Sequence, residues 1–571
     1  MKVTLVVAIL SLLLCSPLTH AQDTKTADTA RRQKAVELLE SLAGQVSSLQ
    51  SAENRARIGA NIAESLWKHN ENRARALFIS IEDDINLGLL DRDLSVSEDA
   101  LTVRVFLKLR TDTVQRIAKY DPEFALTFLT ATTPQAKDII NMFADEERTL
   151  EVNLAKQIAA TSPDIALKLG RQALARGFST DLLPVLRQLL RKHKDKGITL
   201  YKETVQKLHD TDLTEDWATI DFARALVQSF TPPDTDESAY RELVNTLLTS
   251  ALKAGCDKKP KNEDEEDQFC TELSPLVAIM EKVDPVRARK LKYLAPETLE
   301  ESGNSVGASY ADLEEVAAEG TVDDILALAE KHPRIDMSIY QTAIVKAYQT
   351  GDIERAKKIA NSYPGEPVQR EFLAEQVKRF VSMSEMTAEE VLEFNKKSFA
   401  QLGLHINRAQ VLLAAATTVA ANNKKASLKL LDEASEAVED IKAIGPKMRT
   451  RLMVASLYCS QGSDRGLDII QSQIPKLNEL IDAAVKLDGL DTSYLRDGEW
   501  NMSANGEIGS LLTTLSENAG SFAWCDFDRA VNLAGQFERN EIRIMAQVKL
   551  AQSVFITPSP RKTFFSPYMI R

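Results

Sequence analysis

Apolar residues recur three and four positions apart along most of the chain, which is the spacing of one buried face on an α-helix. One such run consists of Val36, Leu39, Leu42, Val46 and Leu49. Another covers residues 339–348, and after a polar break at 350–352 a further helical run covers residues 353–360. Two helices joined by so short a turn pack antiparallel to each other. The pattern therefore predicts a chain built from helical hairpins.

A recurring pair of residues follows five of the predicted turns. In each place an Ala is followed three residues later by a large apolar residue. The pairs are Ala74 and Leu77, Ala125 and Phe128, Ala166 and Leu169, Ala356 and Ile359, and Ala530 and Leu533. A small residue at this place lets two helices approach closely. In a weaker sixth copy near residue 422, Ala426 is followed by Lys429, and the pattern fails.

Residues 343–356 contain the end of one predicted helix, a glycine turn and the start of the next. This segment resembles tetratricopeptide-like helical repeats. The five Ala positions are 51, 41, 190 and 174 residues apart, so the period of about 34 residues is not kept and the array is degenerate. Most of the chain is similar to exported helical-repeat proteins of bacteria. The resemblance implies an all-α fold, an irregular α-solenoid of antiparallel hairpins in a right-handed superhelical stack, and favours binding over catalysis.

The composition agrees with a folded, mostly helical protein. The chain has 571 residues, of which 44% are hydrophobic and 6% aromatic, with 22 glycines and 19 prolines. This length corresponds to three or four domains of about 150 residues, or to one extended array. The net charge of −13 opposes binding to nucleic acid, whose phosphates are also negative. No nucleic-acid partner is expected.

Residues 1–21 are predicted to be a signal peptide. Met1 and Lys2 form a short basic start, residues 3–15 are almost entirely apolar, and Ala21 is a small residue suited to signal peptidase. A membrane anchor is the alternative interpretation, but the apolar run is shorter than the roughly 20 residues that a spanning helix needs. We expect the mature chain to be exported, periplasmic or secreted, without a membrane span after cleavage.

Two polar interruptions divide the predicted array. The predicted regions are an N-terminal helical-repeat region at 22–254, a Cys-flanked acidic loop with a helix and linker at 255–310, a C-terminal helical-repeat region at 311–556, and a tail at 557–571. A boundary is expected near residue 300. The C-terminal region contains a long glycine-punctuated loop at 487–506. Long loops in repeat proteins often bind partners.

Four cysteines remain after removal of the predicted signal peptide. Cys256 and Cys270 flank the polar segment 257–267, which has no apolar residue to pack. A disulfide between them is predicted, because it would close a surface loop in an oxidising compartment. A bridge between Cys459 and Cys525 is left open, since both lie in predicted helices and buried free cysteines are common. None of the four has the spacing of a zinc site.

The loop 487–506 places acidic residues beside aromatic residues. Tyr494, Asp497, Glu499 and Trp500 are the candidate binding residues. Such mixtures occur in sugar-binding clefts and in glycosidases, where paired carboxylates act as acid and base or nucleophile. The alternative is structural: Trp500 and Tyr494 hold the loop onto the helices, which is the interpretation that we prefer for these residues.

Two functions remain open at this level. The favoured one is an exported, non-enzymatic scaffold that binds a protein, peptide or cell-envelope component on a helical-repeat surface. The alternative is a hydrolase or lyase that acts on polysaccharide or peptidoglycan with carboxylates near the loop 487–506. The sequence contains neither a Gly-x-Ser-x-Gly motif nor a phosphate-binding glycine loop. Accordingly, no catalytic residue, cofactor or metal site is assigned.

Overall fold

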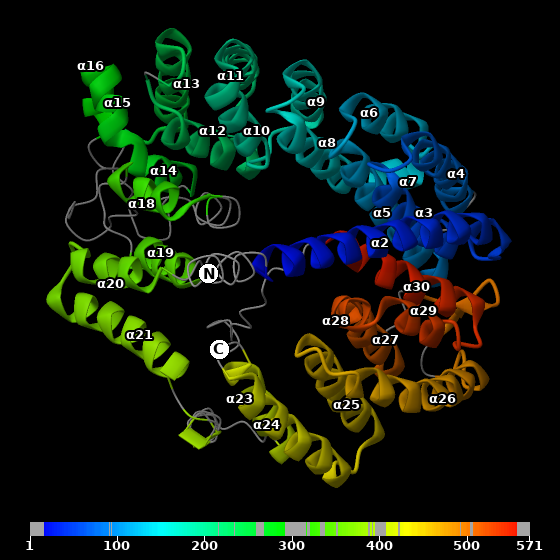
Figure 1. Cartoon of the computed structure of the whole chain (residues 1–571). Coiled ribbons are helices and arrows are strands. Elements are labelled where there is room, and N and C mark those ends of the chain that lie inside the picture. The colour runs from blue at the N-terminus through cyan, green and yellow to red at the C-terminus, as the bar shows by residue number, and fades with distance from the viewer. Residues whose placement is uncertain are drawn as a thin grey trace, which may run out of the picture. The chain divides into compact units, whose positions relative to one another are not determined.

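The computed structural model of the chain is built almost entirely from helices (Figure 1). It describes residues 16–556 apart from 91, 93, 215, 233, 258–267, 292–315, 317–319, 332–336, 350–351, 386, 388, 391, 394–406, 421–422, 491–492 and 503–505. The chain divides into two compact units. Unit 1 comprises Met1–Gly88 and Ala374–Arg571, and unit 2 comprises Leu89–Leu373. The fold is all-α, a solenoid of antiparallel helical hairpins.

Unit 2 stacks its first hairpins in two rows of helices. The first row comprises α5 (Ser97–Ala118), α8 (Ala144–Ile158), α10 (Leu182–Lys192), α12 (Trp217–Ser229) and α14 (Gln268–Leu273). The second row comprises α6 (Pro122–Ala131), α9 (Pro163–Arg176), α11 (Lys194–His209), α13 (Glu237–Ala254) and α15 (Val277–Val283). In the second row α9, α11, α13 and α15 pack in sequence, as Figure 1 shows for the first three. Each hairpin thus buries its apolar face against its neighbours.

The remaining helices of unit 2 are shorter or follow the two rows. They are α7 (Lys137–Met142), η3 (Ser274–Leu276), α16 (Pro285–Ala288), η4 (Arg289–Leu291), α18 (Val322–Lys331), α19 (Met337–Gln349), α20 (Ile353–Ser362) and the start of α21 (Pro367–Glu385). Helix α19 packs between α18 and α20. The predicted linker and the boundary near residue 300 lie outside the described residues, and that boundary stays a prediction.

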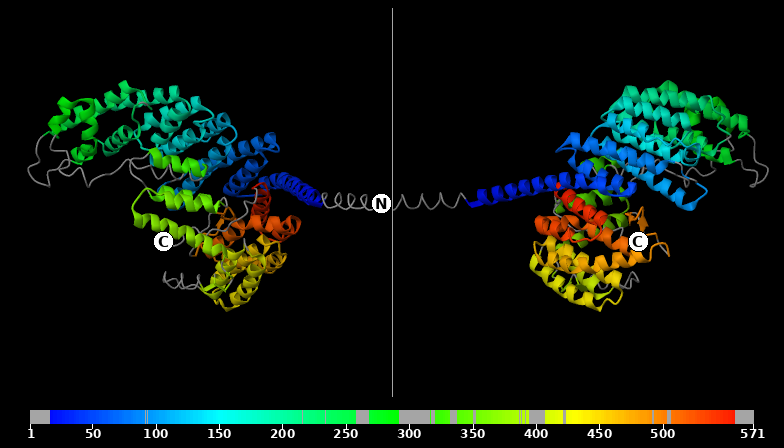
Figure 2. Two further views of the ribbon diagram at one scale, coloured as in Figure 1. Left: turned by 60° about the vertical axis from the view of Figure 1, so that its left-hand side comes forward. Right: turned by 90° about the vertical axis from the view of Figure 1, so that its right-hand side faces the viewer.

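Unit 1 contains helices from both ends of the chain. Its N-terminal elements are α2 (Ser16–Gln45), η1 (Val46–Ser48), α3 (Ala52–Leu66) and α4 (Glu71–Leu89). Its C-terminal elements are α23 (Arg408–Val419), α24 (Lys424–Ala437), η5 (Val438–Asp440), α25 (Ile444–Ser460), α26 (Arg465–Lys486), β1 (Leu495–Arg496), β2 (Glu499–Trp500), α27 (Glu507–Glu517), α28 (Ala519–Cys525), α29 (Phe527–Ala534) and α30 (Asn540–Phe555). Both α2 and α3 pack against α30, and Figure 2 shows the blue and red helices side by side.

The N-terminal helix α2 passes through the predicted cleavage point after Ala21. Residues 1–15 lie outside the described part of the chain, so the signal peptide stays a prediction. Among the helices that the structure describes, none combines the length and the apolar character that a membrane span requires.

One local arrangement starts the second helix of eight hairpins or turns. A capping residue precedes the helix, and its carbonyl oxygen accepts a hydrogen bond from the backbone N–H of a small residue four positions later. These pairs are Asn70 and Ala74, Asp121 and Ala125, Ser162 and Ala166, His193 and Gly197, Asp284 and Ala288, Asp352 and Ala356, Asn423 and Ser427, and Asp526 and Ala530. All eight small residues are buried. The arrangement explains the five Ala positions that the sequence indicated. It also occurs in three further copies, whose small residues are Gly197, Ala288 and Ser427.

The sixth copy was predicted with its register wrong by one residue. Ser427, not Ala426, takes the position of the small residue, and Leu430 follows three residues later. Both side chains are buried. The hydroxyl of Ser427 donates a hydrogen bond to the carbonyl oxygen of Ala416 at 2.9 Å, so a polar residue fits the helix contact without an unsatisfied group.

Gly197 shows how closely two helices approach at this position. A Cβ atom at Gly197 would lie 2.5 Å from the backbone nitrogen of Leu190 and 2.7 Å from its Cα. We therefore expect Gly197→Ala to lower the free energy of unfolding of unit 2 by about 1–3 kcal/mol, because backbone atoms must move apart. Urea denaturation followed by circular dichroism measures this change.

Gly44→Ala in α2 is the matched control. A Cβ at Gly44 would have no neighbour within 4 Å among the described residues. Because Ala favours a helix over Gly by about 1 kcal/mol, this change should be neutral or stabilising. Equal effects of the two substitutions would contradict the close approach at Gly197.

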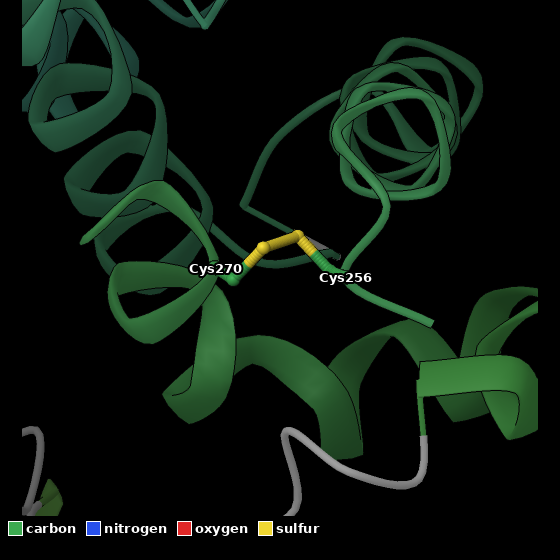
Figure 3. The surroundings of a disulfide bond; sticks show 2 residues. All are labelled: Cys256 and Cys270. Atoms are coloured by element: carbon green, nitrogen blue, oxygen red, sulfur yellow. A yellow bond between two sulfur atoms is a disulfide. The ribbon is translucent and has the colours of Figure 1, made fainter. Parts of the chain in front are cut away.

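Cys256 and Cys270 form a disulfide with a Cα–Cα distance of 5.5 Å (Figure 3). This is the pairing that the sequence favoured. The bridge joins the residues after α13 to α14, while most of the intervening acidic segment, 258–267, lies outside the described residues. The second bridge that the sequence left open does not occur in this structure: Cys459 and Cys525 are free thiols.

Candidate functional site

The loop 487–506 carries a short antiparallel β-hairpin in which Leu495 pairs with Trp500. Asp497 lies at the turn of the hairpin with a φ of 52°, a left-handed conformation. Asp488 holds the base of the hairpin, because its carboxylate accepts hydrogen bonds from the N–H groups of Tyr494 and Leu495. The Tyr494 ring stacks on the Trp500 ring with 5.5 Å between centroids. The loop is thus an ordered element where the structure describes it.

Glu499 caps the N-terminus of α3. Its carboxylate accepts hydrogen bonds from the backbone N–H groups of Gln50 at 2.8 Å and Ser51 at 3.2 Å, and from the Asn54 side chain at 3.1 Å. Ser51 precedes the helix but makes no side-chain cap itself. A carboxylate at this place satisfies unpaired N–H groups and interacts favourably with the helix dipole.

Trp500 and its neighbours attach the hairpin to α30 as well. The backbone N–H of Trp500 donates a hydrogen bond to the Glu541 carboxylate at 2.7 Å. Arg539 pairs with Glu541 at 2.6 Å and donates to the carbonyl oxygen of Gly498 at 2.8 Å. On the other side, Arg496 forms an ion pair with Glu53, which is 1% exposed. We call residues 496–500 with these partners on α3 and α30 the clasp.

The clasp decides which of the four predicted binding residues can reach a partner. Glu499 and Trp500 are 8% and 1% exposed, and their polar groups are engaged with α3 and α30. Tyr494 is half-buried and Asp497 is exposed. This is the packing that the structural interpretation of the loop predicts. Binding at the loop stays a prediction. Of the four candidate residues, Tyr494 and Asp497 are the two whose side chains are accessible to a partner.

A second candidate site is a cavity of about 210 Å³ in unit 2. It lies between α5, α7, α8 and the C-terminal end of α9. The apolar part of its wall comprises Leu107, Pro134, Ile139, Ile140, Phe143 and Leu150. The polar part comprises Arg110, Thr111, Thr133, Glu146, Glu147 and Arg176. We call this space the α5–α8 cavity.

Arg110 is the charged centre of the cavity wall. It is 1% exposed, and its guanidinium donates to both carboxylate oxygens of Glu147, at 2.5 and 3.0 Å. It also donates to the hydroxyl of Thr132 at 3.0 Å and to the carbonyl oxygen of Leu129 at 2.8 Å. A buried guanidinium needs such a set of partners, since an unpaired charge away from water is costly. Arg110 thereby ties α5, α6 and α8 together.

A second ion pair lies beside the first. Glu151 is 4% exposed, and one of its oxygens accepts a hydrogen bond from Arg176 at 2.9 Å. The other oxygen is buried and has no hydrogen-bond partner among the described residues. Burial raises the pKa of Glu151 above its usual value, although the Arg176 guanidinium acts in the opposite direction. The Arg176 side chain is 39% exposed, so this wall of the cavity reaches the surface.

One apolar side chain of α7 is exposed in the cavity wall. Ile140 lines the cavity and is 41% exposed. A largely apolar cavity with an exposed apolar side chain in its wall has the character of a contact surface.

Nothing in the sequence predictions singled out the α5–α8 cavity. One signal was present: Arg110 lies on the apolar stripe of α5, which is formed by Val103, Phe106, Val114 and Ile117. A charged residue on a buried helix face needs a partner, and here the partner is 37 residues away in the sequence. Among the described residues, no group of three His, Cys, Asp or Glu side chains could hold a metal ion.

A scan against models of protein families finds no match, and neither does a search of curated proteins. The chain is similar to a solved structure described as a circular tandem repeat protein with novel repeat topology and enhanced subunit contact surfaces. The identity is 10%, the similarity covers 93% of this chain and 96% of that chain, and the TM-score is 0.14. At this TM-score the likeness carries no argument about function.

Proposed function

We propose that the protein is an exported, non-enzymatic scaffold that binds an extended peptide segment of a partner protein on unit 2. The α5–α8 cavity receives one large apolar side chain of the peptide as its anchor. The observation that supports this proposal most is the cavity itself, with an apolar part of its wall that includes the exposed Ile140.

The size of the cavity favours an anchor side chain over a complete small molecule. Pockets for small-molecule ligands usually have volumes of about 300–1,000 Å³. The α5–α8 cavity has about 210 Å³. Protein interfaces, by contrast, concentrate binding energy in a few apolar or aromatic side chains that fill such pockets.

The charges around the cavity favour a peptide backbone next to the anchor. Arg110 and Glu147 neutralise each other inside the wall, so the apolar interior carries no net charge from this pair. Arg176 uses one hydrogen bond on Glu151 and is partly exposed. Its guanidinium can donate to a carbonyl or carboxylate oxygen of the bound segment.

A selection from a displayed peptide library against the purified full chain tests the proposal. The enriched peptides are expected to share one large aliphatic or aromatic residue. Ile140→Asp should weaken their binding at least about tenfold, because it places an unpaired charge against the anchor. Ile140 is partly exposed, so the substitution leaves the core intact.

Leu490→Asp is the matched control, since Leu490 is 75% exposed and belongs to unit 1. It should leave peptide binding unchanged. Peptides without a common anchor, or peptides that bind the Ile140→Asp variant as well as the original chain, would contradict the proposal.

A further inference from the structure

The two free cysteines of unit 1 lie next to each other where α25 packs against α28. Cys459 is in the last turn of α25, and Cys525 is the last residue of α28. The neighbouring Cys525 thiol and burial both raise the pKa of the Cys459 thiol. Cys525 in turn donates to the carbonyl oxygen of Ser463 at 3.6 Å. Two thiols from distant parts of the sequence therefore lie at the same place, the turn that joins α25 to α26, where α28 ends.

The two sulfur atoms differ in their access to solvent. Cys459 is 4% exposed, whereas Cys525 is half-buried. The absent side chain of Gly466 makes room for the inner thiol, because a Cβ there would lie 2.5 Å from Cys459 Sγ. A reagent can thus reach Cys525 more readily than the buried Cys459.

Some groups around Cys525 lower the pKa of its thiol and others raise it. The neighbouring Cys459 thiol lowers the pKa of the Cys525 thiol below its usual value, while burial and the carboxylates of Asp464 and Asp526 act against this change. The guanidinium of Arg529 also favours the thiolate. The thiolate is the nucleophile in exchange with disulfides.

We propose that Cys525 and Cys459 form a thiol–disulfide exchange site that reacts with small disulfides such as oxidised glutathione. The Cys525 thiol first loses its proton to solvent. The resulting thiolate attacks one sulfur of the small disulfide and releases the other sulfur as a thiolate, which takes up a proton. The Cys459 sulfur then attacks the Cys525 sulfur, loses its proton and releases the second thiol. The protein loses two electrons and two protons, and the small disulfide becomes two thiols.

The reaction links α25 to α28 by a covalent bond. The segment between the two cysteines contains α26, the β-hairpin of the clasp and α27. In the oxidised protein the disulfide closes this segment into a loop. Helices α26 and α27 and the β-hairpin between them are then covalently constrained at both ends of the segment. The inference is independent of peptide binding at the α5–α8 cavity, which belongs to unit 2.

The test uses the full chain with oxidised glutathione as the probe. After mild reduction that leaves Cys256–Cys270 intact, the protein is incubated with the probe. It is then unfolded in guanidinium so that a maleimide reaches every remaining free thiol, and peptides are identified by mass spectrometry. We expect a linked peptide that contains Cys459 and Cys525, and a loss of both maleimide adducts. The oxidised chain should unfold at a higher guanidinium concentration than the reduced chain.

Two variants separate the steps. Cys459→Ser is expected to stop the reaction at a stable glutathione adduct on Cys525, whereas Cys525→Ser should leave Cys459 unmodified because it is buried. Circular dichroism shows whether both variants keep the helical fold, and Cys459→Ala replaces Cys459→Ser if the hydroxyl disturbs the core. If maleimide still labels both cysteines when the chain is unfolded after exposure to the probe, the proposal is wrong. An adduct on Cys525 that Cys459 never displaces also overturns it.

Discussion

Trp500→Ala is expected to lower the free energy of unfolding of unit 1 by about 3–5 kcal/mol. Trp500 is 1% exposed, and its ring stacks on Tyr494. Truncation removes a large buried ring and leaves a cavity that the hairpin cannot fill. Because the same hairpin carries Glu499, the cap of α3 is expected to loosen with it. Guanidinium denaturation followed by far-UV circular dichroism measures the loss.

Leu490→Ala is the control for this substitution. Leu490 lies in the same loop but is 75% exposed, so its truncation should change the free energy of unfolding by no more than about 0.5 kcal/mol. Hydrogen exchange adds a second measurement: Trp500→Ala should reduce the protection of the first turns of α3. Unchanged protection of α3 would show that the clasp does not hold it.

The helical hairpins could be predicted from sequence because their signals are local. The spacing of apolar residues and the small residue after each turn lie within one or two helices. The predicted pair, an Ala followed by a large apolar residue, is narrower than the pattern in the structure. Gly197 and Ser427 fulfil the same role, since the requirement is a small side chain at the helix contact and not Ala itself.

The role of the loop 487–506 could be predicted only in part. Its acids and aromatic residues drew attention to it, and the structural interpretation agreed with the burial of Trp500. The partners of Glu499, however, are Gln50, Ser51 and Asn54, which lie about 450 residues earlier in the sequence. No spacing or motif within a loop contains this information, because the contact forms only when both ends of the chain meet in unit 1.

The α5–α8 cavity was missed for a related reason. The partners of Arg110 come from α6, the segment after it and α8, and each is an ordinary residue in its own context. Only their convergence on one buried guanidinium makes them a site. In such chains a charged residue on the apolar stripe of a helix therefore indicates a partner of opposite charge elsewhere in the fold.

Arg110→Leu is expected to lower the free energy of unfolding of unit 2 by about 3–5 kcal/mol, because it leaves the Glu147 carboxylate largely buried without its partner. The double variant Arg110→Leu/Glu147→Leu should recover most of this loss, since apolar residues can replace a buried ion pair at little cost. Arg171→Leu is the control: its pair with Glu203 is exposed and should contribute at most about 1 kcal/mol. Glu147→Leu completes the set of variants. Denaturation curves of the original chain, the two single variants and the double variant measure the coupling between Arg110 and Glu147, and the Arg171→Leu curve gives the control.

A loss in the double variant equal to the sum of both single losses would contradict this role of the pair. If stability recovers, the double variant also separates two properties of the cavity. Its wall would then lack the charges of Arg110 and Glu147, while Ile140 and Arg176 stay in place. Peptides held by an apolar anchor should bind this variant at least as well as the original chain. Peptides that need the charged wall should lose binding, because the Arg110–Glu147 pair is then absent.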